Sequence, residues 1–247
     1  MSKAARNRQI AREKIAQQLR EEARRARRRR LIAMVAGAVI VAGAVAGIVF
    51  AVTSRHNAAA SHASTPKLKL AALSTLGTLQ PAPGPGPAGA EGVPIPAATP
   101  LASTATDVQG TPVSGIRCQG NEQLLFHIHA HLTIFVNGTA RQIPAAIGVP
   151  AGRNCLYWLH THYPDGVIHI EAPVRRAFTL GDFFDEWGQP LGPNVLGPYA
   201  GHVTALYNGQ VYIGNPRDIP LQAHAQIQLE LGHPLVAPEK ITFPQGL

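Results

Sequence analysis

The stretch LLFHIHAHLTIFV, residues 124–136, decides the fold because polar and apolar side chains alternate along it. Successive residues of a β-strand point to opposite faces, so the pattern predicts a strand with two chemically different faces. One face carries a column of histidines, His127, His129 and His131. The other face is wholly apolar, with Phe126, Ile128, Ala130, Leu132, Ile134 and Val136. A register slip of one residue would exchange these faces, so burial of the apolar set fixes where the histidines lie.

A second polar cluster, HTHYPDGVIHIE at residues 160–171, repeats the two-residue spacing on both sides of a turn. Its polar side chains include His160, His162, His169 and Glu171. The segments Leu156–His162 and Val167–Glu171 are predicted as a hairpin, because the Pro and Gly between them favour a turn. An even loop places His160 opposite His169, whereas a glycine bulge would shift the pairing by one residue. The even loop keeps polar and apolar faces apart, so we expect that register.

Clustered neutral imidazoles beside a carboxylate form the kind of ligand set that zinc and copper prefer. The sequence therefore predicts a transition-metal site for one of these two metals. Its central ligands are expected to be His129, His131, His160 and His162. Extra ligands, or residues that orient the ligands, are expected to be His127, His169 and Glu171. The alternative interpretation is a metal-free polar network on the solvated face of an antiparallel strand.

The remaining pattern predicts a small α+β domain, mostly antiparallel β, with one main helix. Thr179 is a suitable helix cap, and Gly188 is a suitable end. The buried stripe of this helix is expected to consist of Phe183, Phe184 and Trp187. Short strands are expected at Thr139–Ile143, after an Asn-Gly turn, and at Gln226–Leu231.

The segment HVTALYNG at residues 202–209 echoes HLTIFVNG at residues 131–138. Two related strand–turn–strand units would explain this echo. His202 and His224 are expected near the metal only if the second unit packs its strand beside the first.

Cys118 and Cys155 are the two cysteines of the chain, and they predict a disulfide. Closing the loop between them would stabilise the fold by roughly 3–4 kcal/mol. The alternative role is a thiolate ligand in the metal site. The disulfide is favoured because the N-terminal segment predicts a location outside the cytoplasm, where paired cysteines persist.

The N-terminal segment has the pattern of a membrane anchor. Residues 1–30 form a basic arm with 12 Lys or Arg against 3 Glu, whereas the rest of the chain has 10 basic and 11 acidic residues. Residues 31–52 are uncharged and mostly apolar, which as a helix is long enough to cross a bilayer core of about 30 Å. The run RRARRRR directly before them predicts a cytoplasmic arm and a single-pass protein of the cell membrane. The alternative is a cleaved signal peptide, whose apolar region is usually shorter.

The arm and the span also suggest partners. A run of basic charge beside a membrane span favours contact with anionic lipid of the inner leaflet rather than with nucleic acid. Gly43 and Gly47 have the GxxxG spacing that favours a homodimer of spans, although chance also produces it in an Ala- and Gly-rich stretch. Residues 53–113, rich in Pro, Ala and Gly, are predicted as a disordered linker, and residues 114–247 as the extracytoplasmic domain.

Several motifs of the domain occur together in a pattern that resembles a known family. They are HIHAHLTIFVNG, CLYWLHTH, GVIHIEAP, FTLGDFFDEWGQPL and PRDIPLQAHAQIQLELG, within residues 118–233. The combination is similar to that of a family of membrane-anchored prokaryotic proteins with a histidine-rich extracytoplasmic domain. An acidic residue commonly follows HTH in that family, whereas here Tyr163 takes that position and Asp165 comes two residues later. The resemblance implies shared architecture and histidine clusters, and it assigns no activity.

We therefore expect a membrane-anchored, extracytoplasmic domain that binds zinc or copper. One alternative is a hydrolytic enzyme whose histidine-bound metal activates water, with Glu171 or Asp165 as the base. Another is an envelope interaction module whose histidines sense pH without metal. The sequence contains no Gly-rich phosphate loop, serine elbow or CxxC motif, so nucleotide, acyl-transfer and thiol-exchange chemistry have no support.

Overall fold

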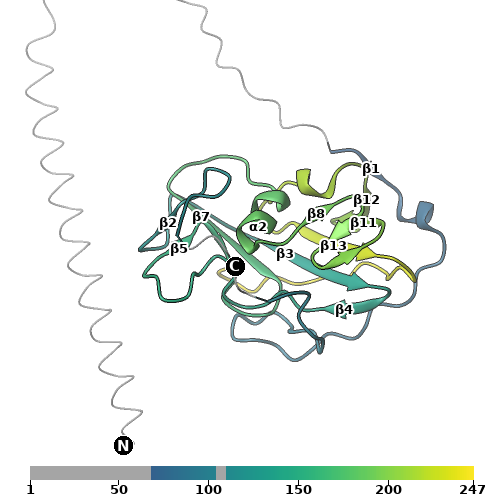
Figure 1. The fold of residues 1–247 in the computed structure, drawn as a ribbon. Helices are drawn as coiled ribbons and strands as arrows, with labels where there is room; N and C mark the ends of the chain where they lie inside the picture. Colours follow the sequence, from purple (N-terminus) through teal and green to yellow (C-terminus); the bar gives the residue numbers. More distant parts are fainter. Residues whose placement is uncertain (1–67, 104–109) are drawn as a thin grey trace, which may run out of the picture. The chain divides into compact units, whose positions relative to one another are not determined.

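A computed structural model of the chain describes residues 68–103 and 110–247 (Figure 1). These residues belong to one compact unit that begins at Thr65 and extends to Leu247. The predicted basic arm (1–30), the predicted membrane span (31–52) and Gly43 and Gly47 lie outside the described residues. Within the described ranges, no helix has the length and apolar character needed to cross a membrane.

The described residues form a main sheet of eight strands with the order β1-β12-β11-β13-β3-β7-β6 and with β4 paired to β3. Its strands are β1 (Leu70–Ala71), β3 (Phe126–Val136), β4 (Thr139–Arg141), β6 (Leu159–His160), β7 (Val167–Ala172), β11 (Val203–Tyr207), β12 (Gln210–Tyr212) and β13 (Gln226–Leu231). Two smaller sheets consist of β2 (Cys118–Gln119) with β5 (Leu156–Tyr157), and of β8 (Leu191–Gly192), β9 (Val195–Leu196) and β10 (Tyr199–Ala200). The helical elements are α2 (Leu180–Trp187), η1 (Leu73–Leu76) and η2 (Pro216–Asp218). Most of the strand pairs are antiparallel, so the predicted α+β class is confirmed for the described part of the chain.

Strand β3 has the two faces that its sequence predicts. Its apolar face, including Ala130, Leu132 and Ile134, is buried in the main core together with the aromatic side chains of α2. The strand ends at the turn of Asn137 and Gly138, both with positive φ, and returns as β4. Because the apolar face is committed to the core, the histidines of β3 all lie on the opposite face.

The predicted hairpin around the second histidine cluster has the even register. His160 pairs with His169 and Leu159 pairs with Ile170 in the antiparallel ladder of β6 and β7. The single strand predicted at Leu156–His162 is, however, divided into β5 and β6. The division arises because β5 pairs with β2, whereas β6 pairs with β7.

The predicted helix and its cap are confirmed. The Thr179 hydroxyl accepts a hydrogen bond from the Asp182 amide, and the Asp182 carboxylate accepts one from the Thr179 amide, which forms a capping box. Gly188 ends the helix with a φ of 70°. This helix covers the apolar side of the sheet, because Phe183, Phe184 and Trp187 join the same core cluster as β3.

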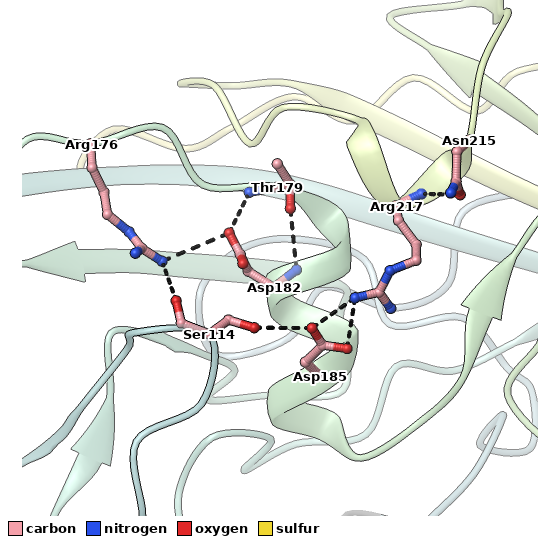
Figure 2. A network of polar contacts seen from close by, with 7 residues as sticks. All are labelled: Ser114, Arg176, Thr179, Asp182, Asp185, Asn215 and Arg217. Atoms are coloured by element: carbon pink, nitrogen blue, oxygen red, sulfur yellow. Dashed lines mark hydrogen bonds and ion pairs between the residues drawn. The ribbon is translucent and has the colours of Figure 1, made fainter.

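Charged side chains attach the helix to its neighbours (Figure 2). Arg217 of η2 donates from Nη2 to both carboxylate oxygens of Asp185, at 2.8 and 2.7 Å. Ser114 donates to the same carboxylate at 3.1 Å, and its carbonyl oxygen accepts a hydrogen bond from Arg176. The helix is therefore held from two sides, by η2 and by the segment before β2.

The echoed segments form two similar hairpins, β3–β4 and β11–β12. They are not adjacent, because β13 lies between β3 and β11 and pairs with β3 in parallel. The second unit therefore does not pack its strand beside the first, which was the condition for placing His202 near the metal.

The prediction of a linker at residues 53–113 requires correction for its described part. Strand β1 pairs with β12, and Val93 and Leu101 are almost fully buried. The Leu101 amide donates to the Gln142 carbonyl, and the Gln80 amide donates to the Leu235 carbonyl. Although a segment rich in Pro and Gly cannot fold alone, these few anchors hold it on a core that other residues build. The domain therefore includes residues 68–103, and its predicted boundary at residue 114 is too late.

The predicted disulfide is present. Cys118 and Cys155 are bonded, with their Cα atoms 5.3 Å apart, and they join β2 to β5 next to the β6–β7 hairpin. Neither cysteine therefore offers a thiolate to a metal.

Candidate metal centre

Most of the histidine face of the sheet is buried. His129, His131, His160 and His169 are each 5% exposed or less, and Glu171 is 3% exposed. A solvated polar face of an antiparallel strand would be open to water, so that alternative does not describe this surface. Buried imidazoles and a buried carboxylate need hydrogen-bond partners or a metal to offset the loss of hydration.

Three adjacent strands bring the histidines together. In the β3–β7 ladder His127 pairs with Glu171 and His129 pairs with His169, and in the β6–β7 ladder His160 pairs with His169. The ring centroid of His169 lies 4.6 Å from that of His129, 5.3 Å from that of His160 and 4.3 Å from that of His162. His169 therefore lies at the centre of the cluster.

Two groups of potential ligands result, and they share two members. The first group consists of His127, His129, His169 and Glu171. The second group consists of His160, His162, His169 and Glu171. Within each group the ligand atoms lie within 4.8 Å of one another, close enough for a small adjustment to bring them onto one ion. His127 and His162 are the exposed members, so each group has one histidine at the surface.

Two buried polar atoms of these groups have no hydrogen-bond partner among the described residues. They are Nε2 of His160 and Oε2 of Glu171. The Tyr157 carbonyl can only accept, so His160 donates to it from Nδ1 over 2.9 Å and leaves the lone pair of Nε2 free. The other carboxylate oxygen of Glu171 lies 3.3 Å from Nε2 of His127 and 3.7 Å from Nδ1 of His169. A free imidazole lone pair and a free carboxylate oxygen are the atoms that bind a metal ion.

Burial keeps three of the grouped histidines neutral. It lowers the pKa of His129 to about 4, with His169 as the next contribution. Burial is also the main cause that lowers the pKa values of His160 and His169 to about 3. At neutral pH these imidazoles are therefore unprotonated, which is the state that binds metal.

Glu91 is a neighbour of this centre that the sequence did not predict. Its Oε1 lies 3.2 Å from Nε2 of His169. Burial, and secondly the charge of Asp165, raises the pKa of Glu91 to about 7. Since burial favours the neutral form of His169 too, we treat the contact as a hydrogen bond rather than an ion pair. In the tautomer of His169 that carries its proton on Nε2, this nitrogen donates to Glu91 and Nδ1 is left free toward Glu171, the arrangement by which carboxylates orient metal-binding histidines.

No sequence signal pointed to Glu91, because it lies in the Pro- and Gly-rich segment. It sits at the tip of a tight turn, in which the Gly92 amide donates to the Gly89 carbonyl and the Gly89 amide donates to the Val93 carbonyl. The burial of Val93 anchors this turn. The segment predicted as linker thus supplies a side chain to the centre.

His131, predicted as a central ligand, is not in either group. Its Nε2 donates to the Asp165 carbonyl at 2.8 Å, and Thr133 donates to its Nδ1 at 3.4 Å. Burial lowers the pKa of His131 to about 4. Both ring nitrogens have protein partners, so His131 behaves as a hydrogen-bonded core histidine next to the centre.

The two histidines of the second unit are members of neither group. His202 and His224 are exposed. The ring of His224 stacks on Phe243, and its Nε2 contacts the carbonyl oxygen of Leu247. They therefore belong to the surface of the domain.

No family model, no curated protein and no solved structure matches this chain. The resemblance stated from the motifs thus stays a prediction. What the arrangement can do follows from its own chemistry, which is a buried set of neutral nitrogen donors around one carboxylate. That donor set suits zinc or copper better than magnesium or calcium, which prefer oxygen ligands.

Proposed function

We propose that this domain binds a transition metal, zinc or copper, through Glu171 and the histidines of β3, β7 and the β6 segment. The observation that carries the proposal is the pair of buried, unpartnered atoms, Nε2 of His160 and Oε2 of Glu171, in the described part of the chain. An unpaired buried polar atom costs about 1–3 kcal/mol, and a bound metal ion removes that cost. Unpartnered buried oxygens also occur at Glu186, but His160 and Glu171 differ from Glu186 because they belong to groups whose ligand atoms lie within 4.8 Å of one another.

Metal binding fits the site better than hydrolysis does. A hydrolytic site needs a base outside the ligand set to take a proton from the metal-bound water. Glu171 belongs to both ligand groups, so it is taken up as a ligand. Asp165 belongs to neither group; its Oδ1 accepts a hydrogen bond from the Val167 amide, and its Oδ2 is buried without a hydrogen-bond partner among the described residues. Hydrolysis would thus need Asp165 as its base, a residue outside the ligand groups, whereas metal binding needs only the groups themselves.

We further propose that the domain lies outside the cytoplasm and is anchored to the cell membrane by residues 31–52. The disulfide between Cys118 and Cys155 supports this, because disulfides persist in oxidising compartments and are rare in the cytosol. The uncharged run and the basic residues directly before it give the same orientation. On this proposal the basic arm meets anionic lipid on the inner leaflet.

Elemental analysis of the full chain, purified without a histidine tag, tests the binding proposal. We expect at least one equivalent of zinc or copper in the wild type and a loss of metal in Glu171→Gln, which keeps the side-chain volume and removes the anionic oxygen. His202→Ala is the matched control, because this exposed histidine lies outside the groups and its loss should leave the metal content unchanged. Circular dichroism reports whether each variant is folded. A folded wild type that holds no metal after reconstitution with both ions would overturn the proposal.

A further inference from the structure

We propose that the centre holds two metal ions, one in each ligand group, with the carboxylate of Glu171 as the bridge between them. This inference rests on the proposed function, since it concerns the number and arrangement of the ions in the same centre. It assigns His127 and His129 to one ion and His160 and His162 to the other.

The order of the strands separates the two pairs of histidines. His127 and His129 lie on β3, whereas His160 lies in β6 and His162 follows it, and β7 runs between these two strands. The backbones of β3 and β6 are two ladder steps apart, or about 9.6 Å. The ligand atoms of each pair lie within 4.8 Å of those of the shared residues His169 and Glu171, and the two pairs fall in different groups. Each pair is thus well placed for its own ion on its own side of β7.

The two members shared by the groups lie on the central strand. Glu171 presents Oε1 toward the first group, at 3.3 Å from Nε2 of His127, while Oε2 is buried without a partner in the described structure. One carboxylate with two available oxygens can bind two ions about 3.5–4 Å apart, the usual separation in two-metal sites. The unpartnered Oε2 is explained if it binds the second ion.

His169 completes the shell of only one of the two ions. A neutral imidazole has one free lone pair, so His169 can bind only one ion; its Nε2 lies 3.2 Å from Glu91 and its Nδ1 lies 3.7 Å from Glu171. One ion then has three histidines and a carboxylate oxygen, which is a closed tetrahedral set. The other has two histidines and the second oxygen, so its remaining positions are left for water. The centre is thus unequal, and we expect one ion to bind more weakly than the other.

Titration of the full chain with Cu²⁺ tests the inference, with bound copper measured after desalting and the spin state measured by electron paramagnetic resonance. We expect two equivalents in the wild type and magnetic coupling between them, because carboxylate-bridged ions are close. His129→Gln and His162→Gln each remove a ligand from one group only, and each should retain one equivalent without coupling. His202→Ala should retain two coupled equivalents, as the control.

The outcomes separate this inference from the proposed function. Saturation of the folded wild type at one equivalent, with that ion weakened in both single variants, overturns the two-ion inference and leaves metal binding intact. Two equivalents of bound copper without magnetic coupling would overturn the proposed bridge through Glu171. No bound copper or zinc overturns both proposals. Circular dichroism of each variant before loading distinguishes a lost ligand from a lost fold.

Discussion

His160 and His169 face each other across the β6–β7 ladder, and their rings stack with centroids 5.3 Å apart. The loop that sets this pairing ends at Gly166, which has a φ of 84°. A Cβ atom added there would lie 2.4 Å from the Leu132 carbonyl oxygen and 2.9 Å from Nε2 of His131. The geometry of the cluster therefore depends on a glycine that no other residue replaces without displacement.

Gly166→Ala is accordingly expected to lower the stability of the domain by more than the strain of a positive φ alone would. A positive φ at a residue other than glycine costs about 1–3 kcal/mol, and the clash with Leu132 and His131 adds to it. Gly209→Ala is the matched control, since Gly209 has a φ of 78° and no atom within 4 Å of an added Cβ. Urea unfolding measures both variants, and equal losses of stability would contradict the expectation.

Glu91→Ala should weaken metal binding about 10–100-fold, the usual effect of removing a group that orients a metal-binding histidine. Without Glu91, Nε2 of His169 loses its carboxyl partner at 3.2 Å, so the orientation of the ring is less firmly held. Competition with a chromophoric chelator measures the affinity. Glu122→Ala serves as the comparison, because Glu122 is half-exposed and lies 3.9 Å from His162, so its loss should change the affinity far less.

His131→Gln should make the stability of the metal-free protein less sensitive to acid. The folded pKa of His131 is about 4 against an ordinary value of 6.5, so the unfolded chain binds the extra proton between these pH values. The wild type should lose on the order of 3 kcal/mol relative to the variant as the pH falls from about 6.5 to about 4. Urea unfolding at pH 7 and pH 4.5 measures this difference, and parallel pH profiles would count against it. The metal content at pH 7 should not change.

Glu186→Gln should have the opposite pH dependence. Glu186 is fully buried, both of its carboxylate oxygens lack hydrogen-bond partners among the described residues, and burial raises its pKa well above 4.5. Above pH 4.5 the unfolded chain releases a proton that the folded protein keeps, so the wild type loses stability as the pH rises. The difference in stability in favour of the variant should therefore grow as the pH rises above 5. Thermal unfolding across that range checks the slope, and a constant difference would refute it.

Leu101→Ala tests whether the Pro-rich segment is part of the domain. Leu101 is 3% exposed and belongs to the main core, so its truncation should cost about 2–5 kcal/mol of unfolding free energy. The comparison is Leu124→Ala, because Leu124 is 66% exposed and its loss should cost about 0.5 kcal/mol or less. If both leucines gave the same small effect, residues 68–103 would contribute little to stability.

The features that the sequence predicted are those with local signals. The period of two in β3 separates histidines from core residues, and Thr179 with Asp182 forms the capping box that begins α2. The even loop before Val167 produced the pairing of His160 with His169. Each of these depends on residues within a few positions of one another, where backbone geometry relates spacing directly to direction.

The features that the sequence missed depend on contacts between distant segments. Nothing in the composition of the Pro-rich segment distinguishes a linker from a chain that docks through Val93 and Leu101, so Glu91 was not expected near His169. The spacing of the histidines in β3 did not predict that His131, unlike His127 and His129, would bond to a backbone carbonyl instead of joining the cluster. That choice depends on Asp165, which lies two residues before Val167, the partner of His131 in the β3–β7 ladder.

Strand β13 pairs in parallel with β3 and antiparallel with β11, so it joins the two similar hairpins into one sheet. Its partner in β3 at His131 is Gln226, near the end of the chain. During synthesis, the edge of β3 that pairs with β13 thus stays unpaired until β13 arrives. An open edge is a template for pairing with other chains, and pairing between distant segments slows folding. Shortening the chain before Gln226 should therefore produce aggregation rather than a smaller folded domain.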